Sequence, residues 1–385
     1  MYTFSGLKNY LDTILVREKV PGFDCRVYKD GAEVFSYHAG YADKENQIPM
    51  KGNEHYFIYS ASKPITCAAA IHAMEEGKLL MTHPVWWYLY KEGFKDIKIK
   101  VKNEDGTISY KTPEREMRVH DLFNMTAGFN YDCSMPEIKA VLKENPNATT
   151  SDIVAAIGRG GLDFEPNTRW QYSLCHDVLA RVVEAAVGER FEDYVKRVIF
   201  EPLGMKNTTY HPTPAQLENM CAQYCFNYSK GMPERVDLKN GYVFTENYDS
   251  GGAGVVTTIE DYSKFAKALA NYGVGENGAR ILSKAGVNLM RTNTLPLDSK
   301  LYEDFSCWMS NAEYGYGFGV RTKIGVGRGG NFCPIGEFGW DGAAGALVSV
   351  SPEKNVAIVY FQHMLNPQHD CTHNKIKNFV HMILE

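Results

Sequence analysis

The sequence predicts an α/β (α+β) protein, in which one antiparallel sheet is flanked by the N- and C-terminal helices and carries a mostly helical inserted domain. Three observations support this fold class. Helical and strand-like patterns follow one another near the N-terminus, helical periodicity dominates the middle of the chain, and strand-like runs followed by a helix return near the C-terminus. We therefore expect the first and last parts of the chain to share one sheet.

The N-terminal part is predicted to form a helix and a β-hairpin. Two strand-like runs occur in FDCRVYKDGAEVFSYHAGYAD, on either side of Lys29-Asp30-Gly31. An Asp-Gly pair between such runs is a strong signal of a tight turn. The helix is indicated by apolar residues at helical spacing, namely Leu7, Tyr10, Leu11, Ile14 and Leu15.

The rest of the chain completes this order of elements. HDVLARVVEAAVGERF has a helical apolar face and ends near Gly188, and the helical pattern continues to Pro202. Strand patterns return in YGYGFGVRTKI and GALVSVSPEKNVAIVYFQHM, with a turn at Pro352 to Asn355, before the helical HNKIKNFVHMILE. We expect residues 1–62 and 250–385 to form the sheet domain and residues 63–249 the helical domain, with the active site in the cleft between them.

Composition limits the class of partner. The chain has 385 residues and a formal net charge of -5, with no basic run, which argues against nucleic acid. No apolar run approaches the ~20 residues of a membrane span, and the N-terminus lacks the pattern of a signal peptide. We expect a cytoplasmic protein whose nine cysteines are mostly small core residues. The oligomeric state is left open.

The stretch HYFIYSASKPITCAAAIHAMEEGKLL places Ser60 three residues before Lys63. Positions i and i+3 lie on the same face of a helix, and an alanine-rich wall around the lysine would lower its pKa and let it act as a base. Ser60 would also lie at the positive end of the helix dipole, which favours an alkoxide. The alternative is an N-capping serine beside a lysine that reaches solvent.

Two further segments support a catalytic reading. In EPNTRWQYSLCHDVLARVVE, Tyr172 precedes a helix and could relay the proton of the serine, and His176 could form a hydrogen bond in the same cleft. Their structural alternatives are a core tyrosine beside Trp170 and a packed histidine at a helix N-terminus.

In EFGWDGAAGALVSVSPEKN, Trp340-Asp341-Gly342-Ala343 opens a strand at a glycine-rich bend. The N–H groups of Ala343 and Ser60 could form an oxyanion hole there. The alternative is a plain hairpin turn. We expect Asp341 to be exposed on the strand edge, although it could also meet a cation of the substrate.

The three motifs in this order resemble the serine β-lactamase and penicillin-binding-protein superfamily. Other segments agree with the resemblance, which covers roughly residues 5 to 385: EEGKLLMTHPVWWYL, HDLFNMTAGFNYD, IFEPLGMKNTTY and GGAGVVTTIEDYSKFAKAL. It implies a β-lactamase/transpeptidase-like fold, with Ser60 as the acylated nucleophile and Lys63 and Tyr172 sharing the acid–base work.

Two departures from the family pattern narrow the branch. The second motif is Tyr172-Ser173-Leu174 rather than Tyr-x-Asn, and Trp340 stands where Lys or His usually precedes the x-Gly. A tryptophan cannot pair with the carboxylate of a β-lactam or a D-Ala terminus. With Asp177, Val178 and Leu179 following, the pattern is similar to family VIII carboxylesterases and related transesterases.

We therefore expect a serine hydrolase that acts on small-molecule esters and needs no cofactor and no metal. Aromatic residues near the predicted cleft suggest an apolar acyl or alcohol group, namely Phe129, Tyr131, Tyr314, Tyr316 and Trp340. The alternatives are a D-amino-acid peptidase or β-lactamase-type amide hydrolase, an acyltransferase to a small-molecule acceptor, and a binding protein without catalysis.

Two other motifs carry less weight. GVGRGG matches a dinucleotide fingerprint through Gly325, Gly327 and Gly330, but no helical pattern follows it. HDCTH offers His369, Cys371 and His373 as metal ligands, but without a second set of ligands at usual spacing. The chain contains no GxSxG motif, which argues against an α/β-hydrolase.

Overall fold

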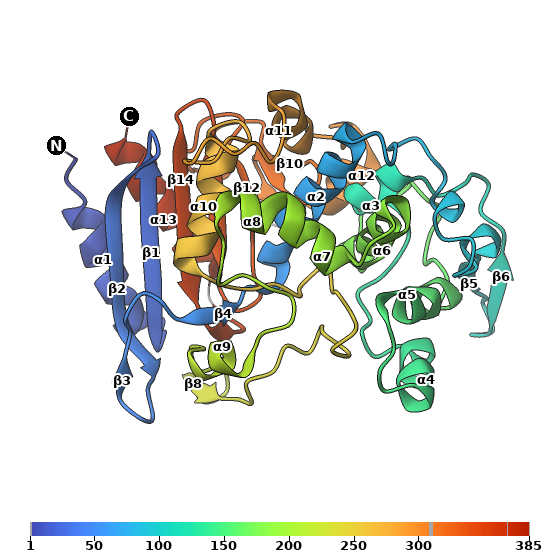
Figure 1. The fold of residues 1–385 in the computed structure, drawn as a ribbon, viewed down its shortest axis with the longest axis horizontal. Coiled ribbons are helices and arrows are strands. Elements are labelled where there is room, and N and C mark those ends of the chain that lie inside the picture. The colour runs from blue at the N-terminus through green and yellow to red at the C-terminus, as the bar shows by residue number, and fades with distance from the viewer. Residues whose placement is uncertain (1, 308–310, 368, 385) are drawn as a thin grey trace.

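The central element is an eight-stranded antiparallel sheet to which both ends of the chain contribute, as predicted (Figure 1). The computed structural model describes residues 2–307, 311–367 and 369–384. The strand order is β10-β11-β12-β13-β14-β1-β2-β3. Their bounds are β1 (Gly22–Lys29), β2 (Ala32–Asp43), β3 (Ile48–Pro49), β10 (Tyr314–Tyr316), β11 (Arg321–Lys323), β12 (Phe338–Asp341), β13 (Leu347–Ser351) and β14 (Val356–Gln362).

The predicted hairpin is confirmed. Lys29 pairs with Ala32, and the two residues between them have positive φ angles, 53° at Asp30 and 80° at Gly31. A two-residue turn of this kind needs a left-handed backbone at both positions, which Asp and Gly tolerate better than most residues. The predicted turn before Val356 is confirmed in the same way, since Ser351 pairs with Val356.

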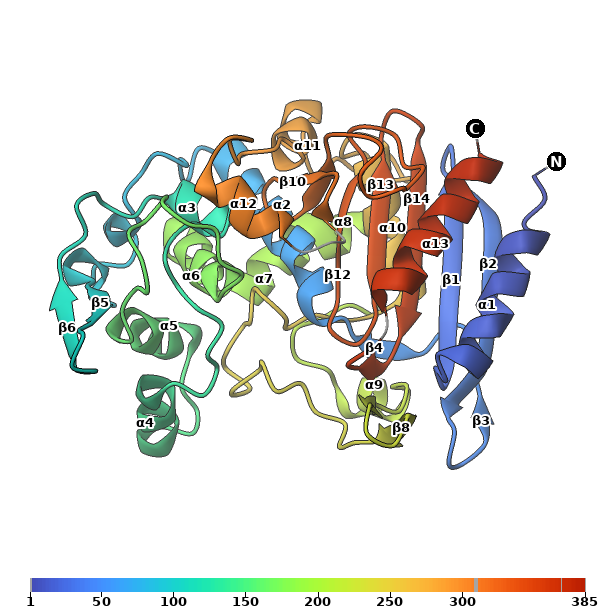
Figure 2. The ribbon, with the colours of Figure 1, turned by 180° about the vertical axis from the view of Figure 1, so that it is seen from behind.

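Helices cover both faces of the sheet. The N- and C-terminal helices α1 (Ser5–Arg17) and α13 (His369–Ile383) lie side by side over one face, and α10 (Ile259–Ala270) packs on the other (Figure 2). Each fully buried leucine or isoleucine contributes about 2 kcal/mol of apolar burial. The α1–α13 side buries Leu7, Leu11, Ile14, Ile376 and Val380 against Cys25, Val27, Ile358 and Tyr360 of the sheet.

The middle of the chain holds most of the remaining helices but is not purely helical. It includes two hairpins, β5–β6 (Ile99–Lys102, Ile108–Lys111) and β7–β8 (Tyr224–Asn227, Met232–Arg235), of which the second pairs with β15 (Met364–Leu365). The predicted domain boundaries remain a prediction. The helices are α2 (Lys63–Glu75), α3 (Val119–Phe123), α4 (Pro136–Glu144), α5 (Thr150–Arg159), α6 (Cys175–Val187), α7 (Phe191–Val195), α8 (Glu201–Leu203) and α9 (Pro214–Glu218), followed later by α11 (Lys284–Met290) and α12 (Lys300–Ser306).

Helix α2 lies at the centre of the molecule and is buried on nearly all sides. Its alanine-rich sequence lets α6 approach closely, and α6 ends at Gly188 as predicted, with φ of 80°. A 3₁₀ turn, η1 (Tyr59–Ser62), leads into α2 from β4 (His55–Phe57), and β4 is paired with β9 (Val256–Thr258). These elements fix the position of the Ser60–Lys63 pair. In the described part of the chain, no helix has the length and apolar character needed to cross a bilayer.

Candidate active site

Ser60 and Lys63 are brought together as predicted, although Ser60 precedes the α-helix rather than lying on it. Ser60 belongs to η1, and Lys63 is the first residue of α2, just before Pro64. The Nζ atom of Lys63 lies 3.1 Å from Oγ of Ser60. Lys63 is fully buried, whereas Ser60 is only half-buried. A substrate could therefore reach the hydroxyl from outside while the amine stays protected from water.

The lysine amine has three acceptors. Besides Ser60, its Nζ donates to the hydroxyl of Tyr131 at 3.2 Å and to the carbonyl oxygen of Gly252 at 2.7 Å. Three acceptors match the three N–H bonds of an ammonium. If the amine is neutral, the Ser60 hydroxyl can donate to its lone pair instead. The contact is therefore suited to passing a proton between serine and lysine.

The turn that carries Ser60 is held from both sides. Tyr59 has φ of 48°, an uncommon conformation for a residue other than glycine, and its hydroxyl accepts a hydrogen bond from Nε2 of Gln223 at 2.8 Å. On the other side of Ser60, Oγ of Ser62 accepts from the N–H of Val255 at 3.0 Å. Such anchoring is needed to keep an unfavourable backbone conformation in place.

Three aromatic side chains stack beside Lys63. The ring of Tyr172 lies 5.3 Å from that of Tyr131 and 5.7 Å from that of Trp340, centroid to centroid, and Nζ of Lys63 lies 4.6 Å from the centroid of Tyr172. The indole N–H of Trp340 donates to the Tyr172 hydroxyl at 3.1 Å. Burial raises the pKa of Tyr131 well above its usual value, so that Tyr131 stays a neutral phenol. The predicted Tyr172 thus lies beside Lys63, and the predicted Trp340 stacks on Tyr172.

The end of β12 lies directly against the turn that carries Ser60. A Cβ atom on Gly342 would lie 2.2 Å from the carbonyl oxygen of Ile58, so only glycine fits. Ala343 follows and packs on a small apolar cluster that contains Phe57 and Tyr59. The bend therefore brings the backbone of Gly342 and Ala343 next to η1.

Asp341 is not exposed on a strand edge. Strand β12 pairs with both β11 and β13 and is therefore an interior strand. The Asp341 carboxylate forms two hydrogen bonds with Arg321, at 2.7 and 3.0 Å, and lies 3.3 Å from Nδ1 of His373. Although burial alone would raise it, these two partners hold the pKa of Asp341 well below its usual value. The carboxylate is thus occupied within the protein.

Two other predicted site residues, His176 and Phe129, are structural. His176 is fully buried, with Nε2 3.1 Å from the carbonyl oxygen of Phe123, and burial lowers its pKa to about 3. Phe129 is buried beside Phe94, with ring centroids 6.2 Å apart. Each is part of the core of the helical region rather than of an accessible surface.

Tyr314 is also buried, and its hydroxyl is occupied within the protein. Its hydroxyl donates to Glu337 at 2.9 Å and accepts from Lys377 of α13 at 2.9 Å. Tyr316 is fully buried too, but it packs edge-on against Trp340 at 5.3 Å and supports the aromatic stack from behind.

Sequence reasoning missed two residues near the site. Tyr242 is half-buried and packs perpendicular to Tyr131 and Tyr59, at 5.5 and 5.9 Å between centroids. In the sequence, Asp177 stands out only as part of a family pattern, yet its carboxylate accepts hydrogen bonds from three residues of the segment 248–252. Tyr242 lies in a stretch without periodicity, so no local signal could have identified it.

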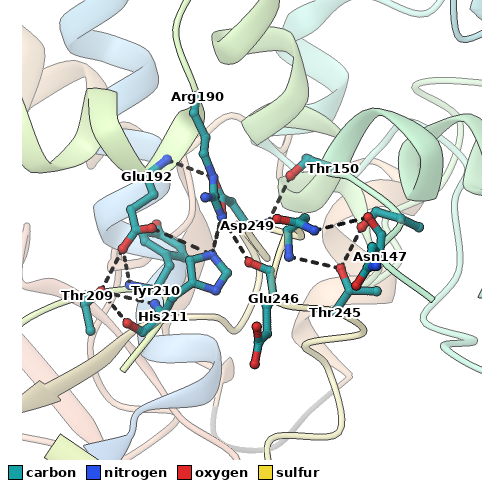
Figure 3. A network of polar contacts seen from close by, with 12 residues as sticks. Asn147, Thr150, Arg190, Glu192, Thr209, Tyr210, His211, Thr245, Glu246 and Asp249 are labelled. Carbon is teal, nitrogen blue, oxygen red and sulfur yellow. Dashed lines mark hydrogen bonds and ion pairs between the residues drawn. The ribbon is translucent and has the colours of Figure 1, made fainter. Parts of the chain in front are cut away.

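A group of potential metal ligands is formed by residues outside the predicted site. Glu192, His211 and Asp249 have ligand atoms within 4.8 Å of one another (Figure 3). Arg190 lies among them, 2.7 Å from Asp249 and 2.6 Å from Nε2 of His211. The guanidinium already supplies the positive charge that a metal ion would bring, so we interpret this group as a structural ion-pair network.

The structure also shows where the glycine-rich GVGRGG motif and part of the HDCTH motif lie. Gly325, Gly327 and Gly330 lie in the connection from β11 to β12, which contains no helix, so the dinucleotide fingerprint has no structural support. The side chains of His369 and Cys371 lie outside the described residues. Nε2 of His373 is close to the carbonyl oxygen of Gly345, at 3.1 Å.

A half-exposed serine beside a buried lysine, with aromatic walls and a strand end close by, is typical of serine hydrolases that use lysine as the base. The chain belongs to the Beta-lactamase family, whose family model matches residues 7–379. Among curated relatives, esterase EstB of Burkholderia gladioli is 25% identical over 284 residues, which cover 67% of this chain and 68% of EstB. The protein is thus a hydrolase of the serine β-lactamase type.

Two solved structures share the fold across nearly the whole chain. EstCE1, described as a hydrolase with promiscuous acyltransferase activity, is 21% identical with a TM-score of 0.78, over 97% of each chain. Simvastatin synthase (LovD) from Aspergillus terreus is 18% identical with a TM-score of 0.80, also over 97% of each chain. They confirm the predicted β-lactamase/transpeptidase-like fold.

Proposed function

We propose that this protein is an esterase that forms an acyl-enzyme on Ser60 and acts on small-molecule carboxylic esters. The observation that carries the proposal is the 3.1 Å contact between the half-buried Ser60 hydroxyl and the fully buried Lys63 amine. A capping serine and a lysine that reaches solvent would leave the amine exposed, which it is not.

In the first step, Lys63 takes the proton of Ser60 as Oγ attacks the ester carbonyl carbon. The carbonyl oxygen becomes an oxyanion, for which the N–H groups of Ser60 and Ala343 are the proposed donors. The tetrahedral intermediate then breaks the bond to the alcohol oxygen, and the alcohol leaves with a proton. In the second half of the reaction, water attacks the acyl carbon and gives its proton to the group that protonated the alcohol. The bond between the acyl carbon and Oγ then breaks as Lys63 returns its proton to Ser60, which releases the acid.

Tyr172 is the proposed donor of the proton to the leaving alcohol. The hydrogen bond from Trp340 occupies a lone pair of the Tyr172 oxygen and not its proton. Tyr131 has a different proposed role, since its hydroxyl accepts from Lys63 and burial keeps it neutral. It would hold the amine in place.

The preference for neutral esters rests on the charges around Trp340. One cation beside Trp340 is Arg321, whose guanidinium lies 5.9 Å from the Trp340 ring and already forms two hydrogen bonds with Asp341. A substrate carboxylate would have to compete with Asp341 for this arginine. Peptides with a free C-terminus and β-lactams are therefore disfavoured as substrates.

Acyl transfer to a small-molecule alcohol or amine is the second candidate. It would use the same acyl-enzyme, with the acceptor in place of water. The description of EstCE1 as a hydrolase with promiscuous acyltransferase activity favours keeping this candidate.

The test is hydrolysis of p-nitrophenyl acetate, butyrate and octanoate by the wild type and by Ser60→Ala, with nitrocefin and D-Ala p-nitroanilide in parallel. The proposal predicts ester turnover that the variant loses, with the other two substrates inert. Intact-protein mass spectrometry after treatment with a fluorophosphonate should show one adduct on the wild type and none on the variant. Full activity of Ser60→Ala would refute the proposal.

A further inference from the structure

Asp177, in the first turn of α6, forms hydrogen bonds with the segment 248–252, which contacts the proposed catalytic lysine. Its side chain is buried, and Oδ1 accepts hydrogen bonds from the hydroxyls of Tyr248 and Ser250, each at 2.7 Å, and from the N–H of Gly252 at 3.3 Å. All three donors belong to residues 248–252. The carboxylate thus fixes both the start and the end of this segment.

The same segment contacts α2 through two carbonyl groups. The carbonyl oxygen of Gly252 accepts from Lys63 at 2.7 Å, and that of Gly251 accepts from the Thr66 hydroxyl at 2.7 Å. The fit leaves no room for a side chain, because a Cβ on Gly252 would lie 2.5 Å from Oδ2 of Asp177. Asp177 and Lys63 are therefore on opposite sides of one tightly packed backbone segment.

The Lys63 amine and the Asp177 carboxylate can also balance each other's charge. Lys63 is fully buried, and Oδ2 of Asp177 is buried without a hydrogen-bond partner among the described residues. A buried charge is costly unless an opposite charge lies close by. Gly252 contacts both groups, since its carbonyl oxygen accepts from Lys63 and its N–H donates to Asp177, so each group can serve as the counter-charge of the other.

Other titratable groups near Lys63 do not supply this charge. Burial raises the pKa of the Cys67 thiol well above its usual value and that of Cys133 to about 12, and burial lowers the pKa of His176 to about 3. These groups are neutral at neutral pH. The phenol of Tyr131 is neutral as well. Tyr172 contacts the Lys63 amine through the face of its ring.

We propose that Asp177 is a positioning residue for the reaction at Ser60, because it turns the Gly252 carbonyl toward Lys63 and stabilises the ammonium that forms when Lys63 takes the serine proton. This inference rests on the proposed function. Asp177 does not touch the substrate and acts through Gly252 and Lys63.

The test separates charge from geometry. Asp177→Asn removes the charge and keeps one carbonyl acceptor, whereas Ser250→Ala removes one hydrogen bond and keeps the charge. We expect Asp177→Asn to lower kcat for p-nitrophenyl butyrate about 10- to 100-fold with little change in KM, and to move the acid limb of the kcat/KM profile to lower pH by about 0.5–1 unit. Ser250→Ala should lower kcat by about fivefold or less and leave the acid limb in place.

Asp249→Asn is the matched control. Asp249 is also a buried carboxylate on this segment, but it pairs with Arg190 and His211 rather than facing Lys63 (Figure 3). Its loss should not move the acid limb. The proposal is wrong if Asp177→Asn keeps the wild-type profile, or if Asp249→Asn moves the limb by the same amount.

A second variant keeps the proposal testable if Asp177→Asn does not fold. If circular dichroism shows that Asp177→Asn does not fold, the double variant Tyr248→Phe/Ser250→Ala retains the charge but loses two of the three hydrogen bonds. Its rate of labelling by a fluorophosphonate should fall about tenfold, and a wild-type rate would refute the positioning role. Labelling does not require ester turnover, so this result is independent of whether esters are the substrates.

Discussion

The indole N–H of Trp340 donates a hydrogen bond to the hydroxyl of Tyr172 at 3.1 Å. This contact joins the end of strand β12 to a loop that lies 168 residues earlier in the chain. It gives Trp340 a polar role in addition to the apolar wall that the sequence suggests. The donor should stabilise negative charge on the Tyr172 oxygen while the proton moves.

Trp340→Phe tests this role. Phenylalanine keeps an aromatic ring at this position but has no N–H donor. We therefore expect kcat for p-nitrophenyl butyrate to fall about tenfold while KM changes less than about twofold. Trp340→His keeps a ring N–H and should recover part of the loss. Tyr316→Phe is the neighbouring control, since its buried hydroxyl has no hydrogen-bond partner among the described residues. Equal kcat values for Trp340→Phe and wild type would show that the donor does not contribute.

Tyr131→Phe and Tyr172→Phe should affect the reaction differently. If Tyr172 passes the proton to the leaving alcohol, Tyr172→Phe should lower kcat about 10²- to 10⁴-fold. Loss of the Tyr131 hydroxyl removes one of the three acceptors of Lys63, and we expect a fall of about tenfold. Steady-state kinetics on the two variants, with melting temperatures to verify folding, decides the assignment. A larger loss in Tyr131→Phe would transfer the proton relay to that residue.

Tyr242→Ala should change the size of substrate that the enzyme accepts. The half-buried ring of Tyr242 stands perpendicular to that of Tyr131, whose hydroxyl contacts Lys63. Without it, we expect kcat/KM for p-nitrophenyl octanoate relative to the acetate to rise about tenfold. Tyr242→Phe retains the ring and serves as the control. An unchanged chain-length profile in Tyr242→Ala would place the acyl group elsewhere.

The elements of the fold that could be predicted from sequence are those with local causes. The Asp30-Gly31 turn follows from the backbone preferences of two residues, and α1 and α6 follow from the spacing of their apolar side chains. The Ser60–Lys63 contact is also local, because its partners are only three positions apart in the chain. The order of the motifs in the sequence also predicts that Tyr172 and Trp340 lie near this pair of residues.

The errors concern contacts that depend on sheet register and long-range packing. The sequence does not show that Arg321 and Asp341 lie on paired interior strands, so sequence reasoning alone predicts an exposed Asp341. In the same way, Phe129 and Tyr314 have the aromatic character of a cleft lining but are buried. Burial of an aromatic side chain is decided by the whole fold and not by its neighbours in sequence.

A buried acid outside the candidate site predicts an unusual pH dependence of stability. Asp24 on β1 is fully buried, and both its carboxylate oxygens lack a hydrogen-bond partner among the described residues. Arg26 is 3.7 Å away, which is too long for a hydrogen bond. Burial raises the pKa of Asp24 from 3.8 to about 7, which outweighs the opposing effect of Arg26.

The direction of this pH dependence follows from the linkage between folding and proton binding at Asp24. Because the pKa of Asp24 is higher in the folded state, the folded protein binds the proton more tightly than the unfolded chain. Its contribution to stability is fully present below about pH 4, where both states are protonated, and is lost as the pH rises through about 7. A shift of about three units corresponds to an upper bound on the order of 4 kcal/mol.

Asp24→Asn replaces the acid with a neutral side chain of similar size and should remove this pH dependence. Urea unfolding of wild type and variant at about pH 5 and about pH 8 measures the difference in free energy at each pH. We expect the variant to gain stability relative to the wild type between the two, by about 1–3 kcal/mol. Glu33→Gln is the control, because its carboxylate is 43% exposed and lies 3.9 Å from Arg26. A constant difference between wild type and Asp24→Asn at both pH values would mean that Asp24 is charged in the folded protein, with a partner or a water molecule that satisfies it.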